Sequence, residues 1–168
     1  NERYSPARPY FPEPAGLLSA APLLLGTDGT KMGKSRNNSI QLRHTADETA
    51  RLLARAKTDG ERVITYEPQR RPEVASLLLI GALCRDEQPE ALASQIAGQG
   101  AAGLKAMVTE AVNEIFAPIR ARRTELAADP GYLQTVLETG NERARATADN
   151  TLAAVRQLMH QDYTAPLS

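Results

Sequence analysis

The chain has 168 residues, enough to bury one sizeable core. Its 20 lysines and arginines balance 20 aspartates and glutamates, which excludes binding of nucleic acid by net charge alone, so any RNA contact needs a local patch or a shaped surface. Aromatic residues make up 4% and tryptophan is absent, a composition that favours helices over a β-sandwich or barrel.

The first segment of the chain is expected to be irregular and then briefly extended. Residues Asn1 to Pro14 contain four prolines among aromatic and charged residues, which is typical of a connector. The apolar residues from Leu17 to Leu25 predict a short buried strand, because the run is brief and ends in glycines.

A glycine-rich loop follows the predicted strand and is the most informative segment of the sequence. It reads Gly-Thr-Asp-Gly-Thr-Lys-Met-Gly-Lys-Ser over residues 26–35 and places Lys31 and Lys34 three positions apart. Ammonium groups are strong hydrogen-bond donors, and glycines adopt conformations that other residues disfavour. Such a loop can hold a polyphosphate whose negative charge increases during a reaction. Taken alone, the two lysines are equally compatible with a solvated basic turn.

From Thr45 onward the sequence predicts one helix after another. Thr45 and Glu48 have the spacing of a capping box, so a helix is expected to run to about Lys57. The turn residues Thr58-Asp59-Gly60 end it, and a short extended piece is expected over Arg62–Tyr66.

Prolines mark the starts of later helices, because the missing N–H does no harm at the first helical position. Pro72 begins one whose expected buried stripe consists of Val74, Leu77, Leu78 and Leu83. Pro89 begins another that runs to about Ala97, and Gly98–Gly103 is expected to be a hinge or turn. In the long helix that follows, Pro118 predicts a kink or a break. The apolar stripe of that helix consists of Leu104, Met107, Val108, Ala111, Val112, Ile115, Phe116 and Ile119.

The last helical stretch begins with Asp129-Pro130 as cap and start, runs to about Glu138 and is expected to be interrupted at Gly140. A final helix carries the stripe Ala144, Ala148, Thr151, Leu152, Val155 and Met159. The stripes are wide enough for a packed bundle and too irregular for a coiled coil. The predicted fold class is therefore mainly α.

The glycine-rich loop of residues 26–35, called the lysine loop below, resembles the Lys-Met-Ser-Lys-Ser signature of class I aminoacyl-tRNA synthetases, with Gly33 in place of a serine. Further segments resemble bacterial tryptophanyl-tRNA synthetases, in the same order and over almost the full length of the chain. These segments are residues 57–60, 63–67, 72–78, 113–123 and 140–145. The resemblance implies a helical bundle attached to the terminal edge of a Rossmann-like nucleotide-binding domain. Residues 1–43 would end the catalytic domain, and residues 44–168 would form the anticodon-binding region and the C-terminal helix.

The resemblance also implies an activity, that of a tryptophan–tRNA ligase. Such enzymes activate tryptophan with ATP to an enzyme-bound adenylate and transfer it to tRNA(Trp). Lys31 and Lys34 would then be the catalytic residues that stabilise the ATP phosphates, with Ser35 as a weaker third ligand, while Met32 positions the loop. Gly33 belongs to the same ATP-binding segment, although it lacks the hydroxyl of the usual serine. The implied partners are ATP with Mg²⁺, tryptophan, tRNA(Trp) and a second subunit in a homodimer, with no membrane, DNA or tightly bound metal.

Arg120, Arg122 and Arg123 form a basic cluster at the end of the long apolar helix. They either contact the tRNA anticodon stem or form a solvated helix end that complements the helix dipole. The same two interpretations apply to Arg70 and Arg71.

The remaining reactive side chains predict no further site. His44 and His160 are far apart in the sequence and lack partner cysteines, so no zinc site is expected, and His44 is interpreted as a residue at a helix start. The single cysteine, Cys84, excludes an internal disulfide, fits a reducing cytoplasm and is expected in the core. No apolar run reaches the ~20 residues of a membrane span.

The other signature of these synthetases, of the His-x-Gly-His type, is not in the sequence, and the first residue is Asn1. We therefore expect the chain to be the carboxy-terminal half of a synthetase. The alternative is a free-standing helical module that binds tRNA or a partner and retains a relic of the lysine loop. An unrelated helical scaffold protein is a third interpretation.

Overall fold

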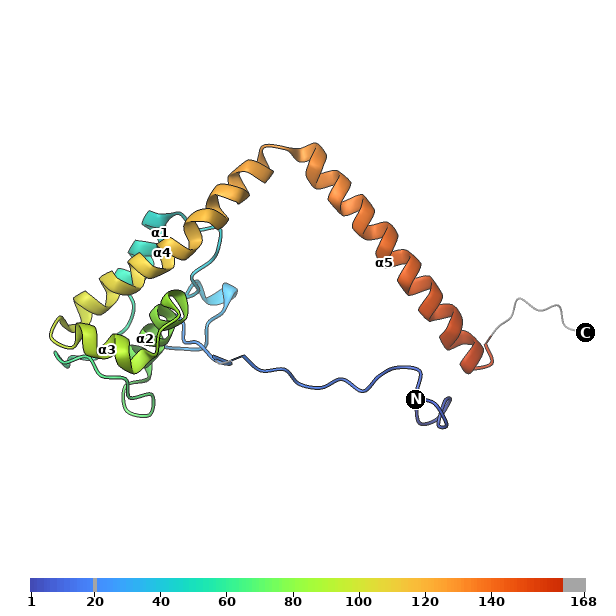
Figure 1. The fold of residues 1–168 in the computed structure, drawn as a ribbon, viewed down its shortest axis with the longest axis horizontal. Coiled ribbons are helices and arrows are strands. Elements are labelled where there is room, and N and C mark those ends of the chain that lie inside the picture. The colour runs from blue at the N-terminus through green and yellow to red at the C-terminus, as the bar shows by residue number, and fades with distance from the viewer. Residues whose placement is uncertain (20, 162–168) are drawn as a thin grey trace, which may run out of the picture. The chain divides into compact units, whose positions relative to one another are not determined.

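The computed structural model describes residues 1–19 and 21–161, and over these ranges it contains five α-helices and one short 3-10 helix (Figure 1). The mainly helical fold class is thus confirmed. The chain divides into two compact units, one of residues 18–124 and one of residues 1–17 with the part from residue 125 onward.

Helix α1 (Ala46–Ala54) begins at the predicted capping box. Thr45 Oγ1 accepts a hydrogen bond from the Glu48 N–H at 3.1 Å, and the Thr45 N–H donates to Glu48 Oε2 at 2.8 Å. The helix ends earlier than predicted, because the N–H of Lys57 donates to the carbonyl of Thr27 at 2.7 Å instead of continuing the helix. This bond directs the chain back to the lysine loop.

Prolines begin the next two helices, α2 (Pro72–Arg85) and α3 (Pro89–Ile96), as predicted. Helix α2 is buried over most of its length, and its buried residues include Val74, Leu77 and Leu78 of the predicted stripe. Helices α2 and α3 pack against each other.

The predicted stripe of α2 is wrong at Leu83, which is 49% exposed. Leu83 lies five positions beyond the previous stripe residue, which is roughly 140° around a helix of ~3.6 residues per turn. Gly81 takes the core position instead. A Cβ atom on Gly81 would lie 3.1 Å from Leu92 Cδ2 of α3 and 3.2 Å from Met107 Sδ of helix α4 (Gly100–Ala127). The missing side chain therefore lets three helices approach.

The first half of α4 carries the predicted stripe into the core, burying Leu104, Met107, Val108, Ala111 and Val112. Further along, Ile115 and Ile119 are 45% and 41% exposed, so the end of the apolar stripe lies outside the core of the chain. Phe116 is partly buried and packs against the core.

The breaks predicted around α4 are shorter or missing. The helix already begins at Gly100, inside the turn predicted over Gly98–Gly103. Pro118 does not break the helix, which continues to Ala127. Proline removes the N–H that would bond the carbonyl of Glu114, but both residues are exposed, so water can satisfy that carbonyl.

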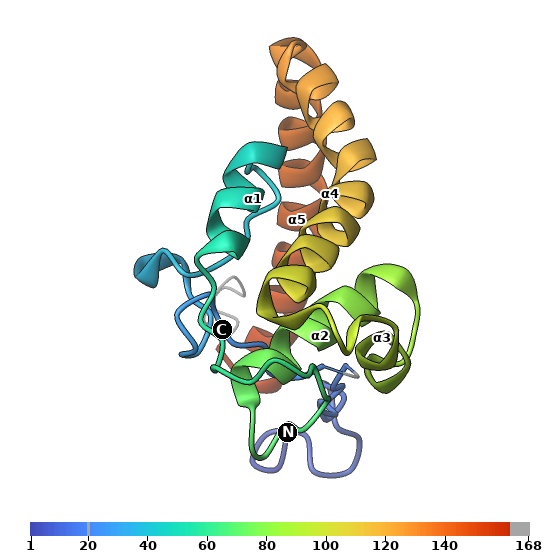
Figure 2. The ribbon, with the colours of Figure 1, turned by 90° about the vertical axis from the view of Figure 1, so that its left-hand side faces the viewer.

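Helix α1 runs antiparallel to α4. Lys105 Nζ donates to the carbonyl of Ala54 at 3.2 Å, and Asn113 Nδ2 donates to the carbonyl of Ala46 at 3.3 Å. Figure 2 shows α1 along one side of α4 and the α2–α3 pair along another. The fully buried side chains of this core include Leu53, Ile64, Leu78, Leu92, Leu104 and Val108.

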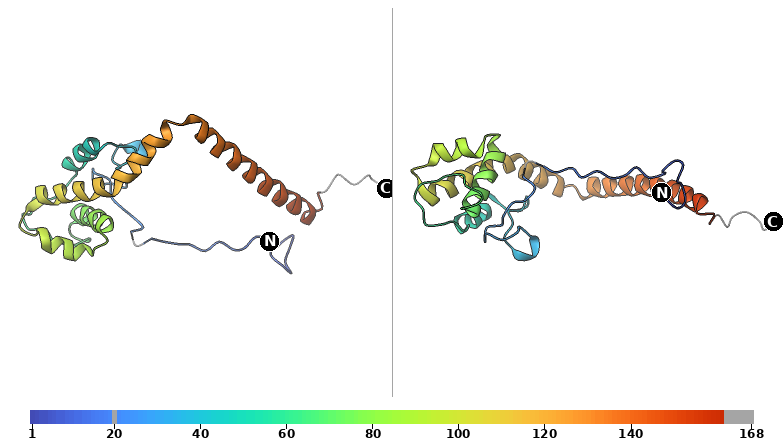
Figure 3. Two further views of the ribbon diagram at one scale, coloured as in Figure 1. Left: turned by 45° about the horizontal axis from the view of Figure 1, so that its top comes forward. Right: turned by 90° about the horizontal axis from the view of Figure 1, so that it is seen from below.

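Helix α5 (Pro130–Leu158) begins as predicted, with Asp129 Oδ1 accepting from the Tyr132 N–H at 2.9 Å. The predicted interruption at Gly140 is wrong, because α5 passes through it as one continuous helix (Figure 3). A glycine inside a helix costs about 1 kcal/mol relative to alanine, which is too little to divide a helix of 29 residues. None of the residues of α5 is buried within the chain.

The predicted strand over Leu17–Leu25 is wrong. Leu17 and Leu18 are 97% and 81% exposed, and the described residues show only an isolated antiparallel bridge between Leu25 and Lys31. A strand needs neighbouring strands for its backbone groups, and the described residues form none. No described helix is both long enough and apolar enough to cross a membrane.

Candidate functional site

The lysine loop begins with a tight turn that is fastened to helix α2. The N–H of Leu25 donates to Ser76 Oγ of α2 at 2.9 Å. The Gly26 N–H then donates to the Thr30 carbonyl at 2.7 Å, and the Gly29 N–H donates to the Gly26 carbonyl at 2.9 Å. Gly29 has a φ of +80°, a conformation that residues with a side chain rarely adopt. The chain therefore reverses directly before the first lysine.

Asn38 joins this turn to the segment that carries the lysines. Asn38 is only 2% exposed. Its Oδ1 accepts from the Gly33 N–H at 2.8 Å, while its Nδ2 donates to Asp28 Oδ1 at 2.8 Å and to the Lys31 carbonyl at 3.2 Å. One buried amide thus bonds the backbone on both sides of Met32.

Asp28 is the acceptor at the centre of the turn. The N–H and the hydroxyl of Thr30 both donate to Asp28 Oδ1 at 2.9 Å. The hydrogen bond from the Asn38 amide, followed by that from the Thr30 N–H, holds the pKa of Asp28 below its usual value. Asp28 is therefore a carboxylate at neutral pH and keeps its role as an acceptor.

Lys31 and Lys34 have exposed side chains on a backbone that is held in place. Lys34 and Ser35 belong to the short 3-10 helix η1 (Lys34–Arg36), which ends at Asn37 in a left-handed conformation with φ of 52°. The exposed lysine side chains can therefore adopt different rotamers, while the backbone from which they extend is held by hydrogen bonds. This arrangement suits the capture of a polyphosphate from solution.

Met32 and Gly33, the other two predicted members of the ATP-binding segment, differ in what they contact. Met32 lines a small cavity together with Leu25, Ile40 and Leu53, so it connects the loop to the core. Gly33 has an extended backbone with φ of −162°, which any residue adopts, and a Cβ atom there would meet only Arg36 Cδ at 4.0 Å. The Gly33 N–H is already bonded to Asn38, so it does not offer a donor to a phosphate.

The ion pair between Lys57 and Glu73 packs against the turn at Gly29. Lys57 Nζ lies 2.7 Å from Glu73 Oε1 of α2. Their mutual hydrogen bond is the main reason that the pKa of Lys57 is raised and that of Glu73 is lowered. A Cβ atom on Gly29 would lie 2.9 Å from Glu73 Cγ, so the turn sits directly against this pair.

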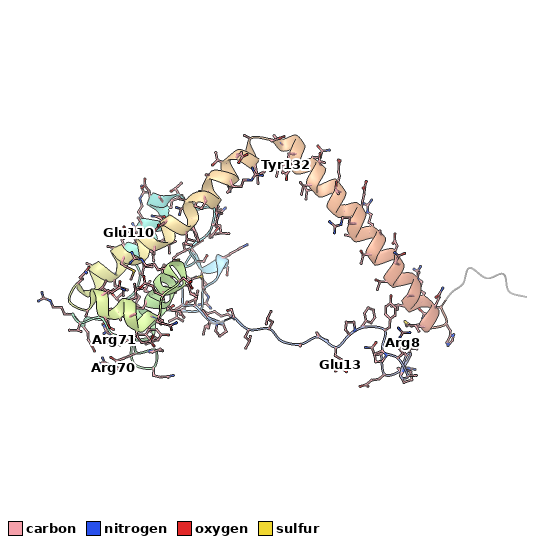
Figure 4. The ribbon with its side chains drawn as sticks, in the orientation of Figure 1. Arg8, Glu13, Arg70, Arg71, Glu110 and Tyr132 are labelled. Atoms are coloured by element: carbon pink, nitrogen blue, oxygen red, sulfur yellow. The ribbon has the colours of Figure 1, made fainter. Side chains whose placement is uncertain are left out.

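Arg70 and Arg71, which lie side by side before α2 (Figure 4), are bound within the chain. The Arg71 side chain is 2% exposed, and its Nε and Nη2 donate to the Asp59 carboxylate at 2.6 and 2.7 Å. Arg70 donates to Glu67 at 2.6 Å and to Glu61 at 2.7 Å. The bond from Arg70, with that from the Thr65 hydroxyl, lowers the pKa of Glu67 to about 2. Arg71 is a structural residue that an RNA cannot reach.

Arg120 is likewise used to hold two helices together. Its Nε donates to the carbonyl of His44 at 2.7 Å and its Nη2 to Thr49 Oγ1 at 3.0 Å, and the guanidinium lies 5.5 Å from the Phe116 ring centroid. These contacts tie α4 to the start of α1. Arg122 and Arg123 follow in α4 and are exposed.

His44 and Cys84 both lie in structural environments. His44 Nδ1 accepts from the Gln41 N–H at 3.2 Å, directly before α1. Cys84 is half-buried against the core, and burial raises the pKa of its thiol, which makes it less reactive. Among the described residues, no group of three or more His, Cys, Asp or Glu side chains could hold a metal ion.

The sequence predicted no role for Asn38, although the segment of residues 36–40 that contains it is part of the resemblance. The feature that could have identified Asn38 is its side-chain amide, which can both donate and accept hydrogen bonds and so can pair backbone groups of a nearby loop. Its contacts with Asp28 and Gly33, ten and five positions away, depend on how the loop is closed. Only the structure makes that closure visible.

Comparison with known proteins identifies the family of the chain. The family model "tRNA synthetases class I (W and Y)" matches residues 1–117. Tryptophan–tRNA ligase 1 of Streptomyces coelicolor is 39% identical over 138 residues, which are 80% of this chain and 40% of that protein. Tryptophan–tRNA ligase of Nostoc sp. is 32% identical over 173 aligned residues, which cover 99% of this chain and 51% of that protein. The chain thus spans about half the length of the curated relatives it matches.

The fold has relatives among solved structures. Tryptophanyl-tRNA synthetase from Campylobacter jejuni aligns with a TM-score of 0.64 at 24% identity, over 82% of this chain and 45% of that one. The enzyme from Mycoplasma pneumoniae aligns with a TM-score of 0.61 at 22% identity, over 83% of this chain and 44% of that one. At these identities the alignments show a shared fold. Since the family model covers more than half of its residues, the chain belongs to the class I tRNA synthetases of the W and Y family.

Proposed function

We propose that this chain is part of a tryptophan–tRNA ligase, which activates tryptophan with ATP and transfers it to tRNA(Trp). Relatives at 32–39% identity carry the name tryptophan–tRNA ligase, and this supports tryptophan over tyrosine as the amino acid. The observation that carries the proposal is the lysine loop, whose exposed ammonium groups stand on a hydrogen-bonded backbone. A module that only bound RNA would have little use for that combination.

In this proposal, Lys31 and Lys34 hold the ATP phosphates and stabilise the charge that develops as pyrophosphate leaves. Removal of one such transition-state donor costs about 3 kcal/mol in other enzymes. Ser35, an exposed residue in the middle of η1, is a weaker third ligand, because its neutral hydroxyl binds a phosphate less strongly than an ammonium group does. Met32 positions the loop through its contacts with the core.

Magnesium, which the family implies, does not fit a site made by the described residues. Mg²⁺ prefers carboxylate and carbonyl oxygens, whereas this loop presents ammonium groups. The carboxylate of Asp28 is already bonded to Asn38 and Thr30. We therefore assign no step to a metal held by this chain.

We further propose that Arg122 and Arg123 contact the tRNA anticodon stem, since both are exposed on the last turns of α4. Arg120 shapes this region by holding α4 against α1. The division at residues 43 and 44, the homodimer and a cytoplasmic location remain predictions from the resemblance.

The test is tryptophan-dependent ATP–pyrophosphate exchange by the full-length enzyme that contains this chain. Lys34→Ala should slow adenylate formation by roughly a hundredfold or more while tryptophan binding changes little. Lys105→Ala is the matched control, because it removes the same charge from α4, where Lys105 donates to the carbonyl of Ala54. An unchanged exchange rate in Lys34→Ala contradicts the assigned role.

The binding-module alternative predicts a different set of results. A full-length protein that binds tRNA but neither exchanges pyrophosphate nor charges tRNA with tryptophan would favour that alternative. Exchange that depends on tyrosine in place of tryptophan would keep the family and overturn the amino acid.

A further inference from the structure

The side-chain amide of Asn38 makes four hydrogen-bond contacts with the lysine loop, although Asn38 lies outside the predicted ATP-binding segment. Besides its bonds to Gly33, Asp28 and the Lys31 carbonyl, its Nδ2 lies 3.2 Å from Thr30 Oγ1. The bonds to Gly33 and Lys31 flank Met32 on both sides. They fix the backbone path between the two lysine-bearing positions.

Resting on the function proposed above, we propose that Asn38 is the positioning residue of the lysine loop. Its amide sets the backbone from which Lys31 and Lys34 extend before ATP arrives. The two lysine side chains then extend from defined positions, and the loop loses less conformational entropy when the phosphates bind. Asn38 touches no substrate in this account and acts only through the lysines.

The chemistry of the site requires an amide at position 38. The Gly33 N–H needs an acceptor, whereas the Asp28 carboxylate and the Lys31 carbonyl need a donor. Alanine supplies neither. Aspartate supplies the acceptor but places a second carboxylate at hydrogen-bond distance from Asp28.

Gly26 provides the space that this amide occupies. A Cβ atom on Gly26 would lie 2.2 Å from Asn38 Nδ2 and 2.3 Å from its Cγ, distances that no real contact reaches. The Thr27 N–H also donates to the carbonyl of Asn38 at 2.9 Å, so the residue is held through its backbone as well. The absence of a side chain at Gly26 therefore leaves the space that the Asn38 amide needs in order to reach the loop.

The experiment uses the full-length enzyme with Asn38→Ala and Asn38→Asp. The control is Asn37→Gly, which removes the neighbouring amide and keeps the left-handed backbone available. The first readout is the kcat and the KM for tryptophan in ATP–pyrophosphate exchange. The second is hydrogen exchange of the Gly33 amide, and thermal unfolding of each variant checks that the fold is intact.

We expect Asn38→Ala to lower kcat by on the order of a hundredfold, the size of effect that misplaced catalytic groups produce. Its KM for tryptophan should stay near that of the control, while the Gly33 amide exchanges faster. Its Tm should fall by a few degrees, because buried polar groups lose their partners, but the unfolding transition should stay cooperative. Asn38→Asp should lose at least as much activity despite its nearly identical size, because the donor is gone and a repulsion is added.

Two results would overturn the proposal. One is wild-type kcat in Asn38→Ala, and the other is wild-type kcat in Asn38→Asp, which would show that volume rather than the amide matters. A failure of the proposed function looks different, because the unaltered enzyme itself would then lack tryptophan-dependent exchange. The exchange rate of the Gly33 amide would still decide in that case whether Asn38 holds the loop.

Discussion

The helical core and the lysine loop of residues 18–124 are held together in opposite ways. The core depends on apolar side chains that are removed from water, such as Leu78 and Leu104, both 0% exposed. The loop has little regular structure; a few backbone bonds close its turn, and the side-chain amide of Asn38 bonds the backbone on both sides of Met32. Stability is therefore spread over many residues in the core, whereas the geometry of the loop depends on very few.

Two ion pairs, Arg71–Asp59 and Lys57–Glu73, connect the two regions, and we call them the polar seam. Arg71 ties the segment after α1 to the start of α2 through Asp59, and the pair Lys57–Glu73 lies directly under the turn. The seam resembles the core in its burial at Arg71 and the loop in its use of polar bonds. The contrast predicts that core substitutions change stability first, that loop substitutions change activity first, and that seam substitutions do both.

The largest effect on stability is expected from the core. Leu78→Ala removes a fully buried side chain between helices and should lower the free energy of unfolding by about 2–5 kcal/mol. Urea denaturation measures the loss, and pyrophosphate exchange well below the Tm should stay near wild type. A loss below about 1 kcal/mol would contradict the assignment of Leu78 to the core.

In the seam, Arg71→Met should cost about 2–3 kcal/mol. The change removes both bonds to Asp59 and the bond from Nη1 to the carbonyl of Val63 at 2.7 Å, and leaves those acceptors without their donor. We place the value below that of a fully buried pair, because the Asp59 side chain is 33% exposed. Arg71→Lys keeps the charge but cannot make both bonds to the Asp59 carboxylate. Its free energy of unfolding, measured with denaturant, should lie between those of Arg71→Met and the wild type.

At the junction of turn and loop, Gly26→Ala should displace the Asn38 amide and lower kcat roughly tenfold, with a stability loss of about 1 kcal/mol. Gly60→Ala is the control, because a Cβ atom at Gly60 meets nothing within 4 Å. Equal kcat values for the two variants, measured by pyrophosphate exchange, would show that the loop tolerates a shift of Asn38.

The smallest expected effect lies at the exposed end of α4, away from the buried core and from the lysine loop. Arg122→Glu combined with Arg123→Glu should weaken tRNA binding by roughly tenfold and reduce its salt dependence, while adenylate formation is unchanged. Binding titrations at two salt concentrations measure both quantities. Equal affinity for tRNA in the variant would remove the anticodon assignment.

The helix starts were readable from the sequence because their causes are local. The capping box of Thr45 and Glu48 and the prolines at positions 72, 89 and 130 each act within one turn, and all were confirmed. The interruption expected at Gly140 was wrong, and Pro118 does not end α4, because a local penalty of one to a few kcal/mol is small beside the many bonds of a long helix.

Contacts between distant residues could not be predicted in the same way. The strand over Leu17–Leu25 was expected from its apolar run alone, without knowledge of a partner strand. The burial of Arg71 depends on Asp59, twelve positions away, and charged residues are rarely expected inside. For the site, the lysines were visible as a pattern, whereas the amide that holds them was not.

The most direct test of the central claim is a crystal structure of the full-length enzyme with a non-hydrolysable ATP analogue. We expect the Nζ atoms of Lys31 and Lys34 to lie about 2.7–3.2 Å from phosphate oxygens, with the Asn38 amide still bonded to Gly33 and to Lys31. A bound nucleotide whose phosphates are gripped elsewhere, while both lysines point into solvent, would contradict it.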